Sequence, residues 1–329
     1  MRVGLIGCGL IGGKRVAALR PEDRLVAVQD RERGRAERLA GTAAPGAQVV
    51  GHWQEVLEAG IDAVLIAVTH DHLAPMTGAA LEAGLHVLVE KPAGRHVDEI
   101  TPLVALAARM GRVVKVGYNH RFHPAVREAK RLVDAGEVGE LLFVRGRYGH
   151  GGRVGYEKEW RCRPEISGGG ELIDQGSHLI DLSRWFLGEF SVVQGHLDTA
   201  FWSMPVEDNC FLSLRTATGR TAWLHASWSE WKNLFCFEIY GRTGKLQIDG
   251  LGGSYGLERL SHYRMSPAMG PPETLIREYP FPDESWREEY LEFIRAIAGG
   301  REPSGSIRDA QAVMAIVAEL YRGHSFPAS

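Results

Sequence analysis

The chain has 329 residues, of which 44% are hydrophobic and 24% charged, and its 38 basic and 41 acidic residues give a formal net charge of −3. These proportions are typical of folded globular proteins and exclude a disordered or fibrous chain. A general nucleic-acid binder would carry a basic face, which the near balance of charge disfavours. Single hydrophobic cores stop growing near about 250–300 residues, so the length favours two domains.

The cysteines and the N-terminal segment bear on the cellular compartment. The four cysteines are far apart, with no C-x-x-C pair, which supports neither a zinc site nor a disulfide framework. The first residues lack the charged start and unbroken apolar core of a signal peptide. Apolar runs such as residues 63–68 are too short to span a bilayer. We expect reduced thiols and a cytoplasmic protein.

Up to about residue 120, short β-branched runs alternate with helix-like segments. The expected strands are residues 3–6, 25–28, 63–68, 86–89 and 112–116, and the expected helices are residues 14–20, 31–40, 53–59, 74–83 and 97–110. Continuous apolar strands separated by helices are typical of a parallel sheet covered on both faces. The pattern predicts an α/β, doubly wound Rossmann domain over residues 1–120.

The rhythm changes after Arg121. A helix at residues 124–135, a strand at 141–148 and a helix at 171–186 are followed by strands at 211–214, 222–228, 235–240 and 245–248. The short connections at 217–220 and 241–244 favour antiparallel pairs. Two amphipathic helices are expected at 286–298 and 307–321. We expect an α+β second domain over residues 121–329, with a mainly antiparallel open sheet.

The first strand runs into Gly7-Cys8-Gly9-Leu10-Ile11-Gly12, a G-x-G-x-x-G pattern between a strand and a helix. In this context the first glycine permits a tight turn, the second lets the backbone approach a pyrophosphate, and the third lets the helix pack closely on the strand. The helix N-terminus offers unpaired N–H groups to the anion. The segment predicts a dinucleotide site, with a flavin or a nucleotide-free domain as the alternative.

The end of the second strand predicts which dinucleotide binds. Asp30 lies 18 residues beyond Gly12, where a carboxylate accepts hydrogen bonds from the adenosine ribose and repels a 2′-phosphate. Arg31 and Arg33 follow, and a guanidinium there can receive a 2′-phosphate, although a solvated helix face is the simpler reading of Arg33. We expect NAD, with NADP left open.

Glu90-Lys91-Pro92 follows the strand at residues 86–89. Ligands of open α/β sheets lie beyond the carboxyl ends of the strands. An ammonium group there stabilises the alkoxide that forms when an alcohol is oxidised. Lys91 is therefore a candidate catalytic residue, and surface solubility is the alternative reading.

The segment at residues 171–186 carries a second candidate set. A helix that begins near Glu171 would place Asp174 and His178 on one face, with Asp181 one turn further. Histidine is the natural proton acceptor near neutral pH, and a carboxylate one turn away would orient it. A metal site is disfavoured because no fourth ligand has convincing spacing. A structural polar face remains the alternative, above all for Asp181.

Together, GCGLIG, EKP and the GGGELIDQGSHLIDLSRW segment at residues 168–185 resemble the Gfo/Idh/MocA family of oxidoreductases, over essentially the whole chain. The resemblance implies an NAD(P)-dependent dehydrogenase that acts on a sugar, inositol or related polyol. It implies catalytic roles for Lys91, Asp174 and His178, and a homodimer or homotetramer formed through the C-terminal sheet. His178 would remove the hydroxyl proton, Lys91 would hold the same oxygen, and Asp174 would bind a neighbouring hydroxyl or orient His178.

The resemblance also implies contact residues, such as Asn119 near the nicotinamide and Arg121 facing the substrate. The expected cofactor contacts are Gly7, Gly9, Leu10, Ile11, Gly12, Asp30, Arg31, Thr69, Glu90, Lys91 and Asn119. The expected substrate contacts are Lys91, Tyr118, Arg121, Trp160, Arg161, Asp174 and His178. The chain departs from the family where Thr69-His70-Asp71-His72 replaces the usual proline after the fourth strand, and where Leu73 takes the place of the usual helix histidine.

Several questions stay open. Basic residues between Arg145 and Arg163 would suit the phosphate or carboxylate of a nucleotide sugar, or else belong to a solvated loop. An NAD-dependent glycosidase of the same fold and a non-enzymatic sugar sensor are the alternatives to a dehydrogenase. Glycine, with 40 residues, is enriched. We expect bare backbone in the glycine-rich stretch between residues 146 and 176 to approach a sugar, whereas residues 250–256 indicate only turns.

Overall fold

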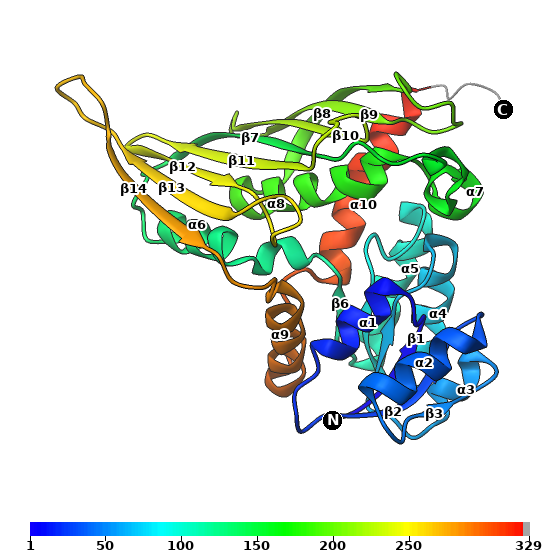
Figure 1. The fold of residues 1–329 in the computed structure, drawn as a ribbon. Coiled ribbons are helices and arrows are strands. Elements are labelled where there is room, and N and C mark those ends of the chain that lie inside the picture. The colour runs from blue at the N-terminus through cyan, green and yellow to red at the C-terminus, as the bar shows by residue number, and fades with distance from the viewer. Residues whose placement is uncertain (325–329) are drawn as a thin grey trace. The chain divides into compact units, whose positions relative to one another are not determined.

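The computed structural model describes residues 1–324, and the strands of its N-terminal part form one parallel sheet (Figure 1). The strands are β1 (Arg2–Ile6), β2 (Arg24–Gln29), β3 (Gln48–Val49), β4 (Ala63–Ile66), β5 (His86–Val89) and β6 (Val114–Val116). Their order is β3-β2-β1-β4-β5-β6, which is the Rossmann order. The predicted doubly wound sheet is confirmed. Strand β3 was not predicted, because two residues are too few to show a strand pattern.

Helices alternate with these strands. They are α1 (Leu10–Ala17), α2 (Arg33–Ala43), α3 (Trp53–Leu57), α4 (His70–Glu82) and α5 (Val97–Met110). The prediction for α5 was correct at both ends. However, α1 begins four residues before its predicted start, because the helix follows directly on the glycine turn, and α4 begins at His70 rather than residue 74. Pro75 lies inside α4, in its second turn.

The first compact unit comprises Met1–Tyr118 and Trp286–Met314. Helix α9 (Ser285–Gly299) contributes Tyr290 and Phe293 to the core cluster that contains Val3 and Leu5 of β1. Both aromatic side chains are at most 1% exposed, so α9 buries its apolar face within this unit. The predicted boundary at residue 120 places residues 286–314 in the second domain, whereas the structure groups them with the first unit. The division into domains stays a prediction.

The second unit, Asn119–Ser285 with residues 315–324, is built on an eight-stranded sheet. Its strands are β7 (Leu141–Gly149), β8 (Phe190–Asp198), β9 (Asn209–Thr216), β10 (Thr221–Ser227), β11 (Leu234–Gly241), β12 (Gly244–Asp249), β13 (Glu258–Arg264) and β14 (Glu273–Tyr279). The order is β14-β13-β12-β11-β7-β10-β9-β8, and only β7 and β10 pair in parallel. The predicted open, mainly antiparallel sheet is confirmed.

Helices cover one face of this sheet. Helix α6 (Pro124–Asp134) packs near β13, and α8 (Ser177–Leu187) packs on β7 and β10, as Figure 1 shows. Helix α10 (Ile307–Arg322) adds Leu320, which approaches Gly195 of β8. The remaining short helices are η1 (Asn119–Phe122), η2 (Tyr156–Lys158), η3 (Trp160–Cys162) and α7 (Pro164–Ser167).

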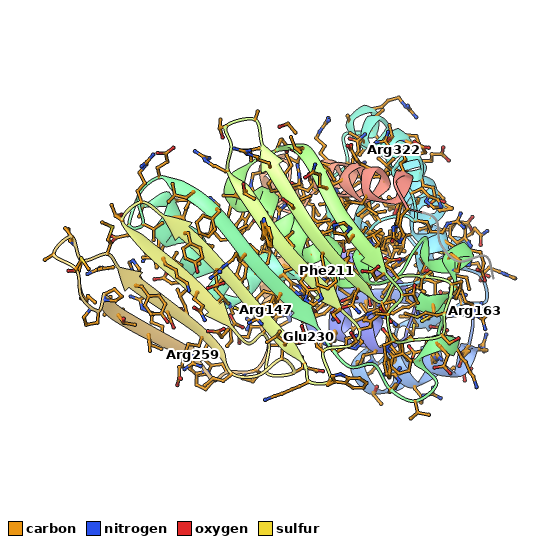
Figure 2. The ribbon with its side chains drawn as sticks, turned by 90° about the horizontal axis from the view of Figure 1, so that it is seen from above. Arg147, Arg163, Phe211, Glu230, Arg259 and Arg322 are labelled. Carbon is orange, nitrogen blue, oxygen red and sulfur yellow. The ribbon has the colours of Figure 1, made fainter. Side chains whose placement is uncertain are left out.

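The opposite face of the sheet carries a hollow of about 650 Å³. Figure 2 shows this face from above, with Arg147 and Phe211 on it. Trp223 is 65% exposed and Phe211 45% exposed there. Within residues 1–324, no helix is long and apolar enough to cross a membrane.

Candidate active site

The glycine turn of the first unit has the geometry that the motif requires. Gly7 has a φ of +93°, and a Cβ added there would lie 2.2 Å from the carbonyl oxygen of Ala67. A Cβ on Gly12 would lie 2.0 Å from the carbonyl oxygen of Gly7, so both positions exclude larger residues. Gly9 precedes α1 and would meet nothing within 4 Å. The turn therefore leaves open space at a helix N-terminus, which fits a pyrophosphate.

Asp30 connects the glycine turn to the end of β2. Its Oδ2 accepts the backbone N–H of Cys8 at 2.7 Å, and its Oδ1 accepts that of Glu32 at 2.8 Å. Each carboxylate oxygen keeps a further lone pair that a ribose hydroxyl can use. Arg31 is exposed, and Arg33 pairs with Glu37 at 2.8 Å, which supports the helix-face reading of Arg33. The residues of this turn thus fit an adenosine dinucleotide.

The segment after β5 is held by buried charges. Glu90 accepts hydrogen bonds from Arg15 of α1, with the ion pair at 2.6 Å. Burial raises the pKa of Glu90, and Arg15 opposes this rise. Lys91, next in the chain, is half-buried. Thr69 directly precedes α4 and donates its hydroxyl to Asp71 Oδ1 at 2.6 Å. Lys91 therefore follows a fixed strand end, where its ammonium can serve a ligand.

In the second unit, the predicted helix from Glu171 is present, but it is not α-helical throughout. A π-helical turn, η4 (Leu172–Gly176), precedes α8, which begins only at Ser177. The α-helical spacing that the prediction assumed does not hold over residues 172–176, so the shared face of Asp174 and His178 stays a prediction. Such turns are frequent at functional sites, and no residue pattern in this segment predicted it.

Asp174 lies beside two of the predicted substrate residues. Its Oδ2 is 3.2 Å from Nε of Arg161, whose guanidinium lies 4.7 Å from the ring centroid of the neighbouring Trp160. The side chains of Asp174 and Arg161 are 15% and 33% exposed. The structure therefore brings Trp160, Arg161 and Asp174 together, with a charged pair that solvent or a ligand can reach.

His178 lies face to face with a histidine that the sequence analysis missed. The rings of His120 and His178 stack with centroids 3.8 Å apart and planes 21° from parallel. Nδ1 of His120 is 3.1 Å from Oδ1 of Asn119, and Nδ2 of Asn119 donates to Oγ of Ser285 at 3.0 Å. Both histidines are at least nine-tenths buried. The Tyr-Asn-His-Arg segment at residues 118–121 contained this signal, because His120 precedes the predicted Arg121.

Arg121 and Asp181 form a buried ion pair. Nε of Arg121 donates to Oδ2 of Asp181 at 2.8 Å, and the second contact, to Oδ1, is 2.5 Å long. Arg121 is 3% exposed and Asp181 fully buried. This pair agrees with the structural reading of Asp181. It also gives Arg121 a structural partner, so its contact with a substrate stays a prediction.

The glycines at residues 250–256 place a tyrosine beside the histidine stack. Tyr255 Oη accepts a hydrogen bond from Nε2 of Gln175 at 2.8 Å, and its ring lies 5.0 Å from that of Tyr148. Tyr148 in turn lies 5.1 Å from the ring of His120. Burial raises the pKa of Tyr255 to about 12, so this phenol stays protonated at neutral pH. Turn residues alone gave no signal for this contact.

The predicted site residues divide between the two units. The first unit holds Gly7, Gly9, Leu10, Ile11, Gly12, Asp30, Arg31, Thr69, Glu90, Lys91 and the fully buried Tyr118. The second unit holds Asn119, Arg121, Trp160, Arg161, Asp174 and His178. Among residues 1–324, no group of three His, Cys, Asp or Glu side chains could hold a metal ion.

Both parts of the chain match family models. Residues 1–118 match the oxidoreductase family with an NAD-binding Rossmann fold, and residues 126–247 match the GFO/IDH/MocA C-terminal domain.

Named relatives are similar to the chain over different lengths. It is 32% identical to levoglucosan dehydrogenase of Pseudarthrobacter phenanthrenivorans over 51% of this chain but only 44% of that protein. It is 27% identical to scyllo-inositol 2-dehydrogenase (NAD(+)) of Bacillus subtilis over 92% of this chain and 88% of that protein.

A solved structure extends the likeness to the whole fold. Levoglucosan dehydrogenase in complex with NADH and levoglucosan superposes with a TM-score of 0.86 at 25% identity, covering 98% of this chain and 97% of the other. Because both parts of the chain match models of one family, the chain belongs to the Gfo/Idh/MocA family of oxidoreductases, and its first unit is an NAD-binding Rossmann domain.

Proposed function

We propose that this protein is an NAD-dependent dehydrogenase that oxidises a secondary alcohol of a sugar or inositol. The observation that carries the proposal is the set Lys91, Asp174 and His178, which supplies an ammonium, a carboxylate and an imidazole in a family with NAD-binding oxidoreductase chemistry. The relatives named above act on levoglucosan and scyllo-inositol, which supports a polyol substrate.

NAD, when bound, accepts the hydride from the alcohol carbon. His178 accepts the hydroxyl proton, which suits an imidazole near neutral pH. The Lys91 ammonium stabilises negative charge on the same oxygen. Asp174 accepts a hydrogen bond from a neighbouring hydroxyl, with Arg161 holding its carboxylate in place. Gly9 and Asp30 bind the cofactor's pyrophosphate and ribose, and Leu10, Ile11, Arg31, Thr69, Glu90 and Asn119 complete its contacts.

A neutral polyol fits better than a nucleotide sugar. Arg153 pairs with Glu159 at 2.5 Å, Arg161 pairs with Asp174, and Arg145 pairs with Glu238 at 2.9 Å. Carboxylates of the protein itself therefore offset several of the basic side chains between residues 145 and 163. The excess positive charge that a phosphate group would need is reduced accordingly.

The test is a panel of inositols, free sugars, anhydrosugars and nucleotide sugars, followed by nicotinamide absorbance with NAD and with NADP. On the best substrate, Lys91→Ala and His178→Asn should lower kcat by about 100-fold or more, a far larger effect than that on NADH binding, measured by fluorescence. Matched controls are the exposed Lys232→Ala and His72→Asn. Near-normal turnover in Lys91→Ala would overturn the assigned roles. No net NADH across the panel, with tightly bound cofactor, would instead support the glycosidase or the sensor.

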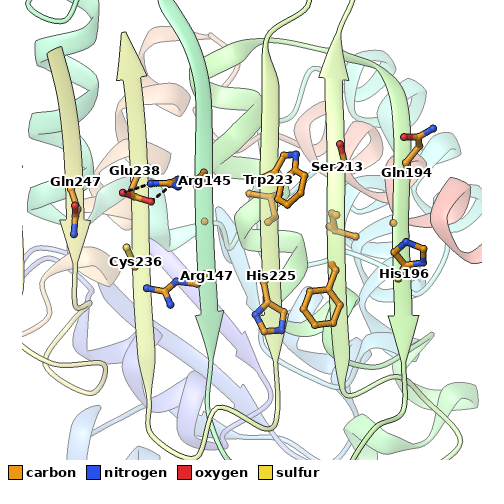
Figure 3. Close-up of a pocket in the computed structure, with 15 residues that line it drawn as sticks. Arg145, Arg147, Gln194, His196, Ser213, Trp223, His225, Cys236, Glu238 and Gln247 are labelled. Atoms are coloured by element: carbon orange, nitrogen blue, oxygen red, sulfur yellow. Dashed lines mark hydrogen bonds and ion pairs between the residues drawn. The ribbon is translucent and has the colours of Figure 1, made fainter.

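We also propose that a second copy of this chain packs on the open sheet face. Figure 3 shows Trp223 and His225 of β10 between Arg145 and Arg147 of β7 and the side chains of β9 and β8. This mixture of exposed aromatic and charged groups is typical of interfaces between copies. A two-fold axis would let the same patch serve on both protomers.

A cytoplasmic location is proposed on the state of the cysteines. Cys8, Cys162, Cys210 and Cys236 are free and buried. Reduced thiols persist in compartments that keep them reduced. Cell fractionation checks this proposal.

A further inference from the structure

Glu207 is a buried carboxylate at which three chain segments meet. It lies two residues before β9 and is 0% exposed. Its Oε1 accepts the N–H of Leu172 at 3.0 Å and the hydroxyl of Tyr321, from α10, at 2.7 Å. Gly170 N lies 3.1 Å from each carboxylate oxygen. The backbone carbonyl of Glu207 also accepts the N–H of Glu171 at 3.0 Å. Glu207 therefore binds the chain just before and at the start of η4.

Gly169 and Gly170 have no side chain, which allows Tyr321 and Glu207 to lie against their backbone. A Cβ on Gly170 would lie 2.1 Å from the carbonyl oxygen of Glu207, and a Cβ on Gly169 would lie 2.0 Å from Oη of Tyr321. Protein atoms thus fill the space beside both glycines, where we expected a sugar to approach bare backbone.

The contacts of Glu207 continue into the proposed catalytic residues. Gly170 donates its N–H to the Glu207 carboxylate, and its carbonyl accepts the N–H of Asp174 at 3.0 Å. Leu172, the other backbone donor, is the first residue of η4. This turn leads directly into α8, whose second residue is His178. A displacement of the Glu207 carboxylate would therefore move the backbone at Asp174 and the turn that precedes His178.

We propose that Glu207 is a positioning residue whose ionised carboxylate fixes the start of η4, and through it the placement of Asp174 and His178. This inference rests on the proposed function. Two N–H groups and a phenol converge on the carboxylate, and a carboxylate accepts hydrogen bonds only. A protonated carboxyl group would present a donor to a set of donors and weaken one of these bonds.

The surroundings of Glu207 place its titration in an accessible range. Burial raises the pKa of Glu207 to about 7, although the hydrogen bonds from Tyr321, Leu172 and Gly170 oppose this rise. The titratable groups around it are Tyr321 of α10, Cys210 of β9 and Glu171 of the turn, and burial keeps the pKa of both Tyr321 and Cys210 well above the usual values. Ionisation near neutral pH is therefore assigned to Glu207 rather than to the thiol or the phenol.

The test compares two neighbouring buried carboxylates. Glu207→Gln removes the negative charge and replaces one of the two acceptor oxygens with an NH2 donor. Asp208→Asn is the matched control, because Asp208 is equally buried but accepts the N–H groups of Ala200, Phe201 and Trp202 instead. Glu207→Gln should lower kcat by about tenfold to 100-fold, as a small misplacement of reacting groups does, with the KM for NAD unchanged. Asp208→Asn should keep the wild-type kcat. Tyr321→Phe, which removes one donor, should have a smaller effect than Glu207→Gln and serves if that variant does not fold.

Amide hydrogen exchange over residues 168–178 gives a readout without turnover. Exchange corrected for the intrinsic pH dependence should be faster in Glu207→Gln than in the wild type at pH 8. In the wild type it should quicken as the pH falls through about 7, and this step should be absent in Glu207→Gln. Wild-type kcat and wild-type protection in Glu207→Gln would overturn the inference. A wild-type protein without dehydrogenase activity would overturn the proposed function alone, because the exchange measurement still decides the role of Glu207.

Discussion

The stack of His120 on His178 restricts one side chain through another. The His178 ring, stacked on that of His120 at 3.8 Å, cannot rotate freely. The His120 ring is in turn held by Asn119, which donates a hydrogen bond to Ser285. A base held in one orientation loses less entropy when it reaches the reacting geometry. His178, one of the three catalytic candidates in the sequence, thus contacts neighbours that only the folded chain supplies.

We expect the choice of NAD over NADP to depend on Asp30. Asp30→Ser removes the charge that repels a 2′-phosphate, while the short hydroxyl can still accept one backbone N–H. We expect kcat/KM for NADP to rise relative to that for NAD by about tenfold or more, which corresponds to about 1.4 kcal/mol. Steady-state kinetics with both cofactors measures this ratio.

The control for this substitution is Arg33→Ser, which removes a charge paired with Glu37 on the same side of the fold. Its cofactor ratio should stay at the wild-type value. An unchanged ratio in Asp30→Ser would show that another residue excludes the phosphate.

At the scale of elements, sequence patterns worked where burial is periodic. Helix α5 and the hairpins β9–β10 and β11–β12 were predicted because buried positions recur regularly along them. Strands β8 and β14 were missed, and so was β13, whose buried positions do not alternate regularly. Most residues of β8 and all but one of β14 are exposed, so neither carries a buried stripe, and their pairing with β9 and β13 is what makes them strands.

Helix α9 joins the first unit through a network of buried charges. Glu289 accepts hydrogen bonds from Arg15 of α1 at 2.5 Å and from Lys115 of β6 at 2.8 Å. Burial by itself raises the pKa of Glu289, but Lys115 and Arg15 outweigh this effect and lower it overall. Its ionised form therefore stabilises the fold above the ordinary glutamate pKa, and this stability is lost as the pH falls through the lowered value.

Glu289→Ala leaves Lys115 and Arg15 buried with fewer partners. Breaking such a buried pair costs about 3–5 kcal/mol of unfolding free energy. Denaturant unfolding at pH 7 measures the loss, which should shrink at low pH where the wild type also loses the charge.

The matched control is Glu302→Gln, a carboxylate that is 53% exposed and 3.6 Å from Arg308. Exposed ion pairs contribute about 0–1 kcal/mol, so this variant should unfold like the wild type. Equal stability of the two variants would contradict a stabilising role for the network.

At the scale of the whole molecule, we expect a second copy of the chain to bind the open face of the eight-stranded sheet. Trp223 alone exposes 65% of its surface, beside Phe211 and His225, whose rings stack at 4.2 Å. An aromatic side chain of this size gains free energy when a partner covers it. Its central place on β10 suits an interface anchor.

Trp223→Glu should convert the oligomer into monomers, because two copies of the new carboxylate would face each other across a two-fold axis or lie buried without a partner. Sedimentation velocity at several protein concentrations measures this change. Trp231→Glu is the control, since Trp231 is 71% exposed but lies outside the hollow. A wild-type chain that sediments as a monomer would contradict the proposed interface.

The sequence by itself determined the family, the Rossmann sheet and the glycine turn, and it favoured NAD with NADP left open. These depend on local patterns: continuous apolar strands, a glycine spacing, and a carboxylate after the second strand. Only the tertiary structure decided the π-helical turn before α8, the partner of His178, the reason for Gly169 and Gly170, and the return of α9 to the first unit. Each of these depends on residues far apart in the chain, as Glu207 is from Leu172 and Tyr321. Sequence spacing carries no information on such pairs, because packing brings them together only once the sheets have formed.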